Sequence, residues 1–294
     1  MARPVITFLS DFGPAAPAVC RGVMFGIAPD ANIIDVNHFV PRYSIRDGSR
    51  SLVFALPHMP VGTHVAVVDP GVGTARLPIA LKVARGDVLI GPDNGLLIDA
   101  AERLGGIVEA RTLENRDLWL PVISSSFHGR DIFAPTAAHL AMGVPFESVG
   151  PTVSIPDLIR LTHPTATVRD GRLETQIVSV MIYGNVTFAG TMLDLTNAVG
   201  PLVAGRPLRL TFGPIGGGAE AAVDGANGGP GTGTAGGGSV VEDTVWGITF
   251  GSVPLGSSVL MSDSEGQLSF ADNQGNAAAR LGLAVDRPVT ITGR

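Results

Sequence analysis

The stretch His64-Val65-Ala66-Val67-Val68-Asp69-Pro70-Gly71 is an apolar run that stops at a carboxylate and then turns. Such an unbroken run is typical of a strand buried on both faces in a parallel sheet. Val5 to Leu9 has the same form and ends at Ser10-Asp11, and Asn32 to Val36 ends at Asn37-His38. These runs place ionisable side chains where buried strands reach loops, and open α/β folds gather their chemistry at such ends.

Helical patterns lie between these strands. Ala18 to Ile27 ends before Pro29, Ile45 to Leu56 places its apolar residues on one face, and Ile132 to Met142 is amphipathic. Ile79 to Val83 and Val88 to Ile90 read as a β-hairpin. The alternation predicts an α/β domain with a largely parallel sheet.

The pattern changes near residue 160, after which short alternating strands replace helices. They predict a smaller all-β domain, a barrel or a sandwich. We therefore expect an α/β N-terminal domain over 1–160, a linker over 161–170 and an all-β C-terminal domain over 171–294. A flexible Gly-rich loop is expected over 216–238, where composition cannot support a packed core. The predicted strands are Gln176 to Ile182, Leu208 to Phe212, Thr244 to Phe250, Ser257 to Met261, Gln267 to Ala271 and Pro288 to Thr292.

The bulk composition narrows the function. With 294 residues, 45% of them hydrophobic and 16% charged, the chain can bury a large core. A net charge of −6 argues against a general nucleic-acid binder. One cysteine, Cys20, excludes an internal disulfide, and the scattered histidines predict no metal site. No apolar run is long enough to span a membrane, and no signal peptide is recognised, so we expect a cytoplasmic protein with a small-molecule ligand.

Three side chains suggest chemistry. Asp69, Arg76 and His128 together supply a carboxylate, a guanidinium and an imidazole, which suffice to orient and activate a water molecule. Asp11 is placed to accept the two hydroxyls of a ribose. Taken singly, each carboxylate is equally well explained as a turn or capping residue, and an isolated Arg76 or His128 is better explained as structural.

Ordered motifs along nearly the whole chain resemble a known family, the S-adenosyl-L-methionine hydroxide adenosyltransferases, which are related to fluorinating and chlorinating enzymes. The motifs are Ser10-Asp11-Phe12-Gly13, Asp35-Val36-Asn37-His38, Val68-Asp69-Pro70-Gly71-Val72-Gly73-Thr74, Gly91-Pro92-Asp93-Asn94-Gly95-Leu96-Leu97, Phe127-His128-Gly129-Arg130-Asp131-Ile132-Phe133-Ala134-Pro135, Gly184-Asn185, Ser264-Glu265-Gly266 and Gly275-Asn276-Ala277.

The resemblance implies a role for each candidate residue. Asp69, Arg76 and His128 match the water-activating triad, and Asp11 matches the carboxylate that holds the ribose diol. The remaining matches are to substrate-binding positions: Asn185 to an adenine contact, Tyr183 to the aromatic position beside it, and Ser264 to the turn that holds the methionine carboxylate.

The resemblance also implies hydrolysis of S-adenosyl-L-methionine to adenosine and L-methionine. The substrate needs no metal or redox cofactor, and a homotrimer with sites at subunit interfaces is expected. Val180, Met181 and Ile182 stand where the family usually has an aspartate for the methionine ammonium. This departure leaves open a hydrolase of another 5′-substituted adenosine, or a non-catalytic sensor of an adenosyl ligand.

Overall fold

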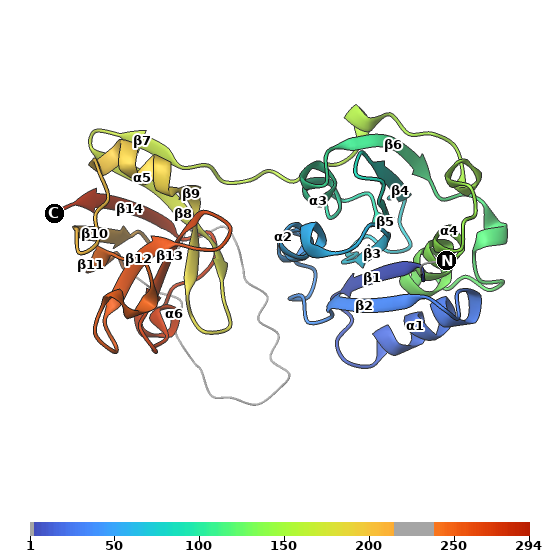
Figure 1. Cartoon of the computed structure of the whole chain (residues 1–294), viewed down its shortest axis with the longest axis horizontal. Helices are drawn as coiled ribbons and strands as arrows, with labels where there is room; N and C mark the ends of the chain where they lie inside the picture. Colours follow the sequence, from blue (N-terminus) through green and yellow to red (C-terminus); the bar gives the residue numbers. More distant parts are fainter. Residues whose placement is uncertain (1–2, 215–237) are drawn as a thin grey trace. The chain divides into compact units, whose positions relative to one another are not determined.

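Two units divide the chain, Met1–Thr162 and His163–Arg294, and each is described here by itself. The computed structural model describes residues 3–214 and 238–294 (Figure 1). The Gly-rich loop expected over 216–238 therefore lies outside the described residues, apart from Gly238. The second unit begins inside the expected linker 161–170, because the short strand β7 (Thr167–Arg169) pairs with the strand that follows it.

The first unit is built on a six-stranded sheet of order β2-β1-β3-β5-β4-β6 (Figure 1). Strands β2, β1, β3 and β5 run parallel, and β4 is antiparallel to both β5 and β6. The predicted parallel sheet and its antiparallel hairpin are thus confirmed. The strands are β1 (Val5–Ser10), β2 (Asn32–Asn37), β3 (Thr63–Val67), β4 (Pro78–Val83), β5 (Val88–Pro92) and β6 (Ile107–Thr112).

Helices cover both faces of this sheet, so each face has its own hydrophobic core. One core packs α1 (Ala16–Ile27) and α4 (Ala134–Ala141) on the sheet, and the other packs α2 (Ile45–Ala55) and α3 (Ile98–Arg103). The helix predicted from Ile132 begins instead as a π-helical turn, Gly129–Phe133, that leads into α4. Short 3-10 turns occupy Leu56–His58, Arg116–Leu118, Phe146–Val149 and Ile155–Asp157.

The second unit is a closed β-barrel. Its described residues form an eight-stranded sheet of order β14-β10-β11-β12-β13-β9-β8-β7, and a further β14–β8 pairing closes it. Inward-facing side chains such as Phe188, Phe212 and Phe270 fill the interior. Of the two predicted alternatives, the barrel is confirmed. The elements are β8 (Arg172–Val180), β9 (Val186–Thr191), α5 (Met192–Val199), β10 (Pro207–Phe212), β11 (Val240–Trp246), a 3-10 turn (Phe250–Ser252), β12 (Ser258–Ser262), β13 (Gln267–Asp272), α6 (Ala277–Leu281) and β14 (Pro288–Gly293).

One buried arginine holds the barrel where the chain leaves β10 and re-enters β11. Arg287 is 1% exposed, and its guanidinium donates to the carbonyl oxygens of Gly213 at 2.7 Å and Gly238 at 3.0 Å. It also donates to the Gly282 carbonyl at 2.9 Å. Burial lowers the pKa of Arg287. Its guanidinium donors are nevertheless satisfied by backbone oxygens, and these hydrogen bonds join three segments of the barrel.

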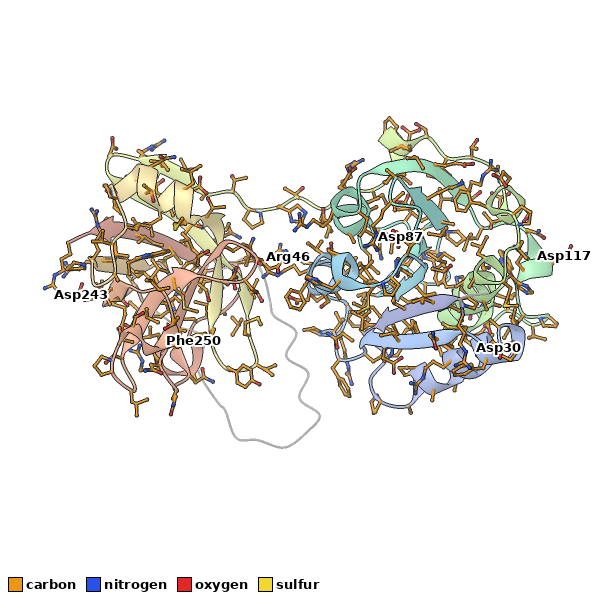
Figure 2. All side chains as sticks on the ribbon, viewed as in Figure 1. Asp30, Arg46, Asp87, Asp117, Asp243 and Phe250 are labelled. Carbon is orange, nitrogen blue, oxygen red and sulfur yellow. The ribbon has the colours of Figure 1, made fainter. Side chains whose placement is uncertain are left out.

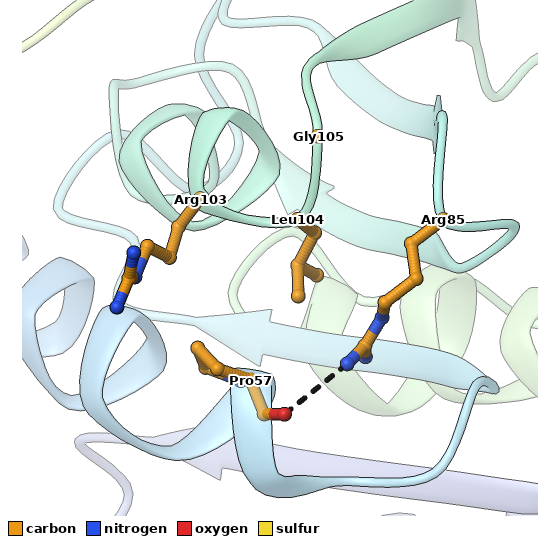
Figure 3. A pocket seen from close by; sticks show the side chains of 5 residues that line it. All are labelled: Pro57, Arg85, Arg103, Leu104 and Gly105. Carbon is orange, nitrogen blue, oxygen red and sulfur yellow. Dashed lines mark hydrogen bonds between the residues drawn. The ribbon is translucent and has the colours of Figure 1, made fainter.

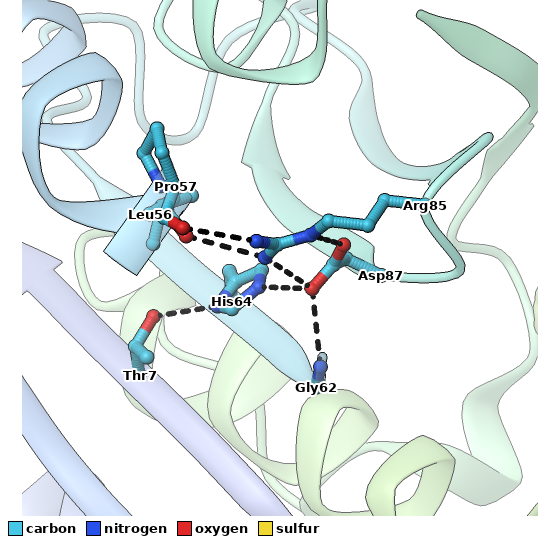
Figure 4. A network of polar contacts seen from close by, with 7 residues as sticks. All are labelled: Thr7, Leu56, Pro57, Gly62, His64, Arg85 and Asp87. Carbon is cyan, nitrogen blue, oxygen red and sulfur yellow. Dashed lines mark hydrogen bonds and ion pairs between the residues drawn. The ribbon is translucent and has the colours of Figure 1, made fainter. Parts of the chain in front are cut away.

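A second buried polar network lies in the first unit (Figure 4). It holds the end of the six-stranded sheet where β3 begins, opposite the end from which the loops after β1 and β3 emerge. Asp87 is fully buried in the first unit (Figure 2) and accepts from His64 Nε2 at 2.9 Å and from Arg85 Nε at 2.7 Å. The other ring nitrogen of His64 lies 2.9 Å from the hydroxyl of Thr7 on β1. Arg85 also donates to the carbonyl of Leu56 at 3.2 Å. Burial raises the pKa of the Asp87 carboxyl, but hydrogen bonds from His64 and Arg85 outweigh it and hold the pKa well below its usual range.

We expect Asp87→Asn to lower the free energy of unfolding of the first unit by about 3 kcal/mol at pH 7, the scale for breaking a buried ion pair from one side. Since the folded-state pKa of Asp87 is depressed, its contribution is complete above the ordinary carboxyl pKa and declines as the pH falls towards the folded-state value. Urea unfolding at pH 7 and pH 3, followed by Trp119 fluorescence in a Trp246→Phe background, should show a smaller difference at pH 3.

Glu102→Gln is the matched control, because its pair with Arg160 at 3.2 Å is solvent-exposed and should contribute under about 1 kcal/mol. Equal losses in the two variants would contradict a special role for the buried network.

Candidate functional site

The loop between β3 and β4 carries an ion pair between Asp69 and Arg76. Arg76 Nε lies 3.0 Å from Oδ1 and 2.9 Å from Oδ2 of Asp69, and its Nη2 also donates to Oδ2. The side chains are only 9% (Arg76) and 4% (Asp69) exposed. The carboxylate thus neutralises and orients the guanidinium within one loop.

His128 completes the cluster from a distant part of the chain. It immediately precedes the π-helical turn, and its Nδ1 lies 3.1 Å from Arg76 Nη2. A guanidinium only donates hydrogen bonds, so Nδ1 must be the acceptor and the imidazole proton sits on Nε2. The structure therefore brings Asp69, Arg76 and His128 together, with His128 in its neutral form.

Burial and charge agree with that protonation state. Burial lowers the pKa of His128 below its ordinary value, and the positive charge of Arg76 lowers it further, against the opposing effects of Asp69 and Asp131. The Arg76 guanidinium also lies over the ring of Phe133, 5.2 Å from its centroid. Phe133 was not among the predicted site residues, because an apolar side chain in a helical pattern reads as core.

Close backbone packing holds the two loops of the cluster in place. Gly73 has a φ of +76°, and a Cβ there would lie 2.4 Å from the Ser125 carbonyl oxygen, so only glycine fits. The amide of Asn94, in the turn after β5, donates to the Val68 carbonyl at 2.8 Å and supports the residue before Asp69. This bond links the turn after β5 to the end of β3.

Asp11 leaves the sheet at the same edge as Asp69. Strands β1 and β3 pair in parallel with Ser10 opposite Val67, so the residues that follow both strands are neighbours. The Asp11 carboxylate accepts the backbone N–H of Tyr43 at 3.1 Å. Tyr43 itself has a φ of 64° and a largely exposed ring. Nothing in the sequence pattern indicated this contact, since it depends on a left-handed backbone conformation.

Asn185 and Tyr183 lie in the turn that joins β8 to β9 in the second unit. The turn is fixed by Gly184, whose φ is +83° and where a Cβ would lie 2.0 Å from the Asn276 side chain. The Gly184 carbonyl accepts from Ala278 N at 2.9 Å. The turn is therefore docked on the start of α6, and the ring of Tyr183 is 72% exposed beside it.

Ser264 is exposed in the turn between β12 and β13, where Asp263 Oδ1 accepts the N–H groups of Glu265 and Gln267 at 2.9 Å. In the β9–β13 ladder, Gln267 pairs with Thr191, at the far end of β9 from Asn185. The register thus places Ser264 and Asn185 at opposite ends of this ladder rather than side by side.

A hollow of about 520 Å³ lies on the first unit away from these residues, lined by Pro57, Arg85, Arg103, Leu104 and Gly105 (Figure 3). Arg85 is already bonded to Asp87 and to backbone carbonyls, so we give this hollow no catalytic role. In residues 3–214 and 238–294, no group of three or more His, Cys, Asp or Glu side chains is arranged to hold a metal ion. Within the same ranges, no helix is both long and apolar enough to cross a membrane.

Comparison with family models gives two matches that together cover most of the chain. Residues 6–150 match the model described as SAM hydroxide adenosyltransferase N-terminal domain, and residues 233–290 match the corresponding C-terminal domain.

Individual relatives agree with the family matches. A protein of Salinispora tropica named (R)-S-adenosyl-L-methionine hydrolase is 39% identical over an alignment of 294 positions, which covers 98% of this chain and 98% of the relative. A fluorinase of an Actinoplanes species is 31% identical over an alignment of 204 positions, which covers 60% of this chain and 68% of the fluorinase. A crystal structure of an uncharacterized conserved protein from Thermotoga maritima matches with a TM-score of 0.80 at 29% identity, over 98% of this chain and 99% of that one.

Proposed function

The chain belongs to the SAM hydroxide adenosyltransferase family, and from this premise we propose that it hydrolyses S-adenosyl-L-methionine to adenosine and L-methionine. The observation that carries the proposal is the bonded cluster of Asp69, Arg76 and His128. Full-length relatives are named for the (R) form of the substrate, so we propose the (R) epimer as the preferred substrate here.

The chemistry is a displacement at the ribose C5′. A new bond forms between the nucleophile's oxygen and C5′, and the C5′–S bond breaks with its electron pair going to sulfur. The sulfonium becomes the neutral thioether of methionine, so the leaving group needs no acid. We propose that the reaction uses no metal or redox cofactor. What the protein must supply is a desolvated, aligned and hydroxide-like oxygen.

The proposed roles follow from the protonation states in the cluster. His128, neutral with its proton on Nε2, donates a hydrogen bond to the nucleophile's oxygen. The positive charge of Arg76 stabilises hydroxide relative to water at this position. The bound water loses its proton to solvent, and the resulting hydroxide then attacks C5′. Asp69 offsets that charge, which would otherwise repel the sulfonium, and holds the guanidinium in place.

Substrate binding is proposed for residues in both units. Asp11 accepts the ribose hydroxyls, Asn185 and Tyr183 hold the adenine, and Ser264 holds the methionine carboxylate. The separation of Ser264 from Asn185 along the β9–β13 ladder supports contacts with opposite ends of an extended substrate.

A single cysteine, Cys20, supports a cytoplasmic setting for the reaction.

Water should outcompete halide as the nucleophile. Incubation with each epimer of S-adenosyl-L-methionine in heavy-oxygen water and molar chloride should yield adenosine labelled at the C5′ oxygen, faster from the (R) epimer. Mass spectrometry of the nucleoside measures both the label and any halide product. Predominant 5′-chloro-5′-deoxyadenosine would contradict the proposal, and absence of turnover would favour a ligand sensor.

His128→Ala and Asp69→Asn should each lower kcat by about 10²-fold or more. This is the usual effect of removing a hydrogen-bond donor or an electrostatic contact that is positioned at the reacting atoms. Because burial and Arg76 lower the pKa of His128, protonation of His128 should reduce kcat only below pH 6.5, in addition to the fall that accompanies protonation of the attacking hydroxide. Steady-state rates from pH 4.5 to 9 measure this. The control is His58→Ala, an exposed histidine of the same unit. Near-normal kcat in folded His128→Ala would remove the histidine from the mechanism.

We further propose a homotrimer whose sites lie at subunit interfaces, each combining the first unit of one subunit with the barrel of its neighbour. Two observations support this. The proposed residues divide between the two units, and the β8–β9 turn exposes apolar side chains, with Ile182 88% and Tyr183 72% exposed.

Complementation tests this arrangement. Coexpressed Asp69→Asn and Asn185→Ala chains should form mixed trimers in which about a quarter of the sites combine two intact halves, and activity should recover accordingly. Asp69→Asn coexpressed with His128→Ala is the control, because both changes lie in the first unit and no intact half-site can form. Equal recovery in both mixtures, or none in either, would contradict shared sites.

A further inference from the structure

One histidine ties the turn that carries Asp11 to the end of β2. His38 follows β2 and is 9% exposed. Its Nδ1 lies 2.8 Å from Ser10 Oγ, and its carbonyl oxygen accepts from Gly13 N at 2.9 Å. His38 therefore contacts the residue before Asp11 and the residue two positions after it, holding the turn at both ends.

The protonation of this network follows from its outer members. Nε2 of His38 lies 3.1 Å from Asp35 Oδ1 without forming a hydrogen bond, so this contact is electrostatic only. The other oxygen of Asp35 accepts from Arg21 at 2.7 Å. The negative carboxylate near Nε2 favours the ring proton on that nitrogen, which leaves Nδ1 to accept from the Ser10 hydroxyl. The Ser10 oxygen in turn accepts the Phe12 N–H at 3.4 Å. The hydrogen bonds thus run from the Phe12 N–H beside Asp11 through the Ser10 hydroxyl to His38, whose far side faces the Asp35–Arg21 ion pair.

A serine, a histidine and an aspartate in line also describe a hydrolytic triad. Here Ser10 is fully buried, and the ring of Phe8 packs edge-on against His38 with 4.7 Å between centroids. The hydroxyl has no access to a ligand, so these contacts cannot serve nucleophilic catalysis. What they do is fix a backbone turn.

We propose that His38 is a positioning residue for the ribose diol: through Ser10 and Gly13 it holds the Asp11 carboxylate in the orientation that receives the two hydroxyls. This inference rests on the proposed function, in which Asp11 binds ribose. Tyr43, whose N–H bonds Asp11 at 3.1 Å, lies in the same loop after β2, so the anchored loop also supplies the second restraint on the carboxylate.

The test compares adenosine with 3′-deoxyadenosine by calorimetry. In the wild type, losing a hydroxyl that faces a carboxylate should weaken binding about tenfold or more. In His38→Ala the ratio of the two dissociation constants, 3′-deoxyadenosine to adenosine, should fall towards its value in Asp11→Asn. In steady-state assays with S-adenosyl-L-methionine, KM should rise about tenfold and kcat should change less than about threefold. His38→Asn, whose amide oxygen can occupy the place of Nδ1, should restore the ratio. His58→Ala should keep the wild-type ratio.

The outcomes separate the two proposals. A wild-type ratio in folded His38→Ala, alongside a collapsed ratio in Asp11→Asn, overturns the role of His38 and leaves the proposed function standing. If His38→Ala does not fold, Ser10→Ala removes only the hydroxyl link; a collapsed ratio there supports the proposal and an unchanged ratio overturns it. A wild type that neither hydrolyses S-adenosyl-L-methionine nor distinguishes the two nucleosides overturns both.

Discussion

The parallel pairing of β1 with β3 is the constraint on which the site depends. With Ser10 opposite Val67, the two strands end together, and Asp11 and Asp69 follow them at the same end of a buried sheet. Each then recruits partners from the loops around that edge. Asp69 binds the guanidinium of its own loop, and Asp11 is restrained by the loop that follows β2. A shift of one residue in this register would separate the two halves of the chemistry.

The arrangement of Asp69, Arg76 and His128 determines the protonation state of the histidine. The carboxylate of Asp69 satisfies one side of the Arg76 guanidinium, and the other side donates to His128. The imidazole is thereby kept neutral beside a cation, in a place where burial already disfavours charge. A neutral ring and an arginine paired with a carboxylate suit the proposed substrate, which is itself a cation, since neither adds an unbalanced positive charge.

Much of this was predictable from sequence, for specific reasons. Unbroken apolar runs ending at Asp11 and Asp69 identify buried parallel strands, and alternation after residue 160 identifies an all-β domain, whereas closure into a barrel depends on the β14–β8 pairing, which no local pattern shows. The six-residue helix α3 was missed because it is too short for a periodic signal, and α5 because its start is marked only by the capping box of Thr191 and Asp194. The tautomer of His128 and the contact of Tyr43 with Asp11 depend on three-dimensional geometry, which no local pattern encodes.

Arg287 gives the barrel a property that its strands alone would lack. Gly213 follows β10 and Gly238 precedes β11, and the carbonyl oxygens of both residues accept hydrogen bonds from the buried Arg287 guanidinium. The separation of these two points is thus set by the barrel itself and does not depend on the length of the chain that joins them. The interval between Gly213 and Gly238 is therefore a place where a protein engineer can graft a reporter or a binding module while Arg287 holds the two ends together.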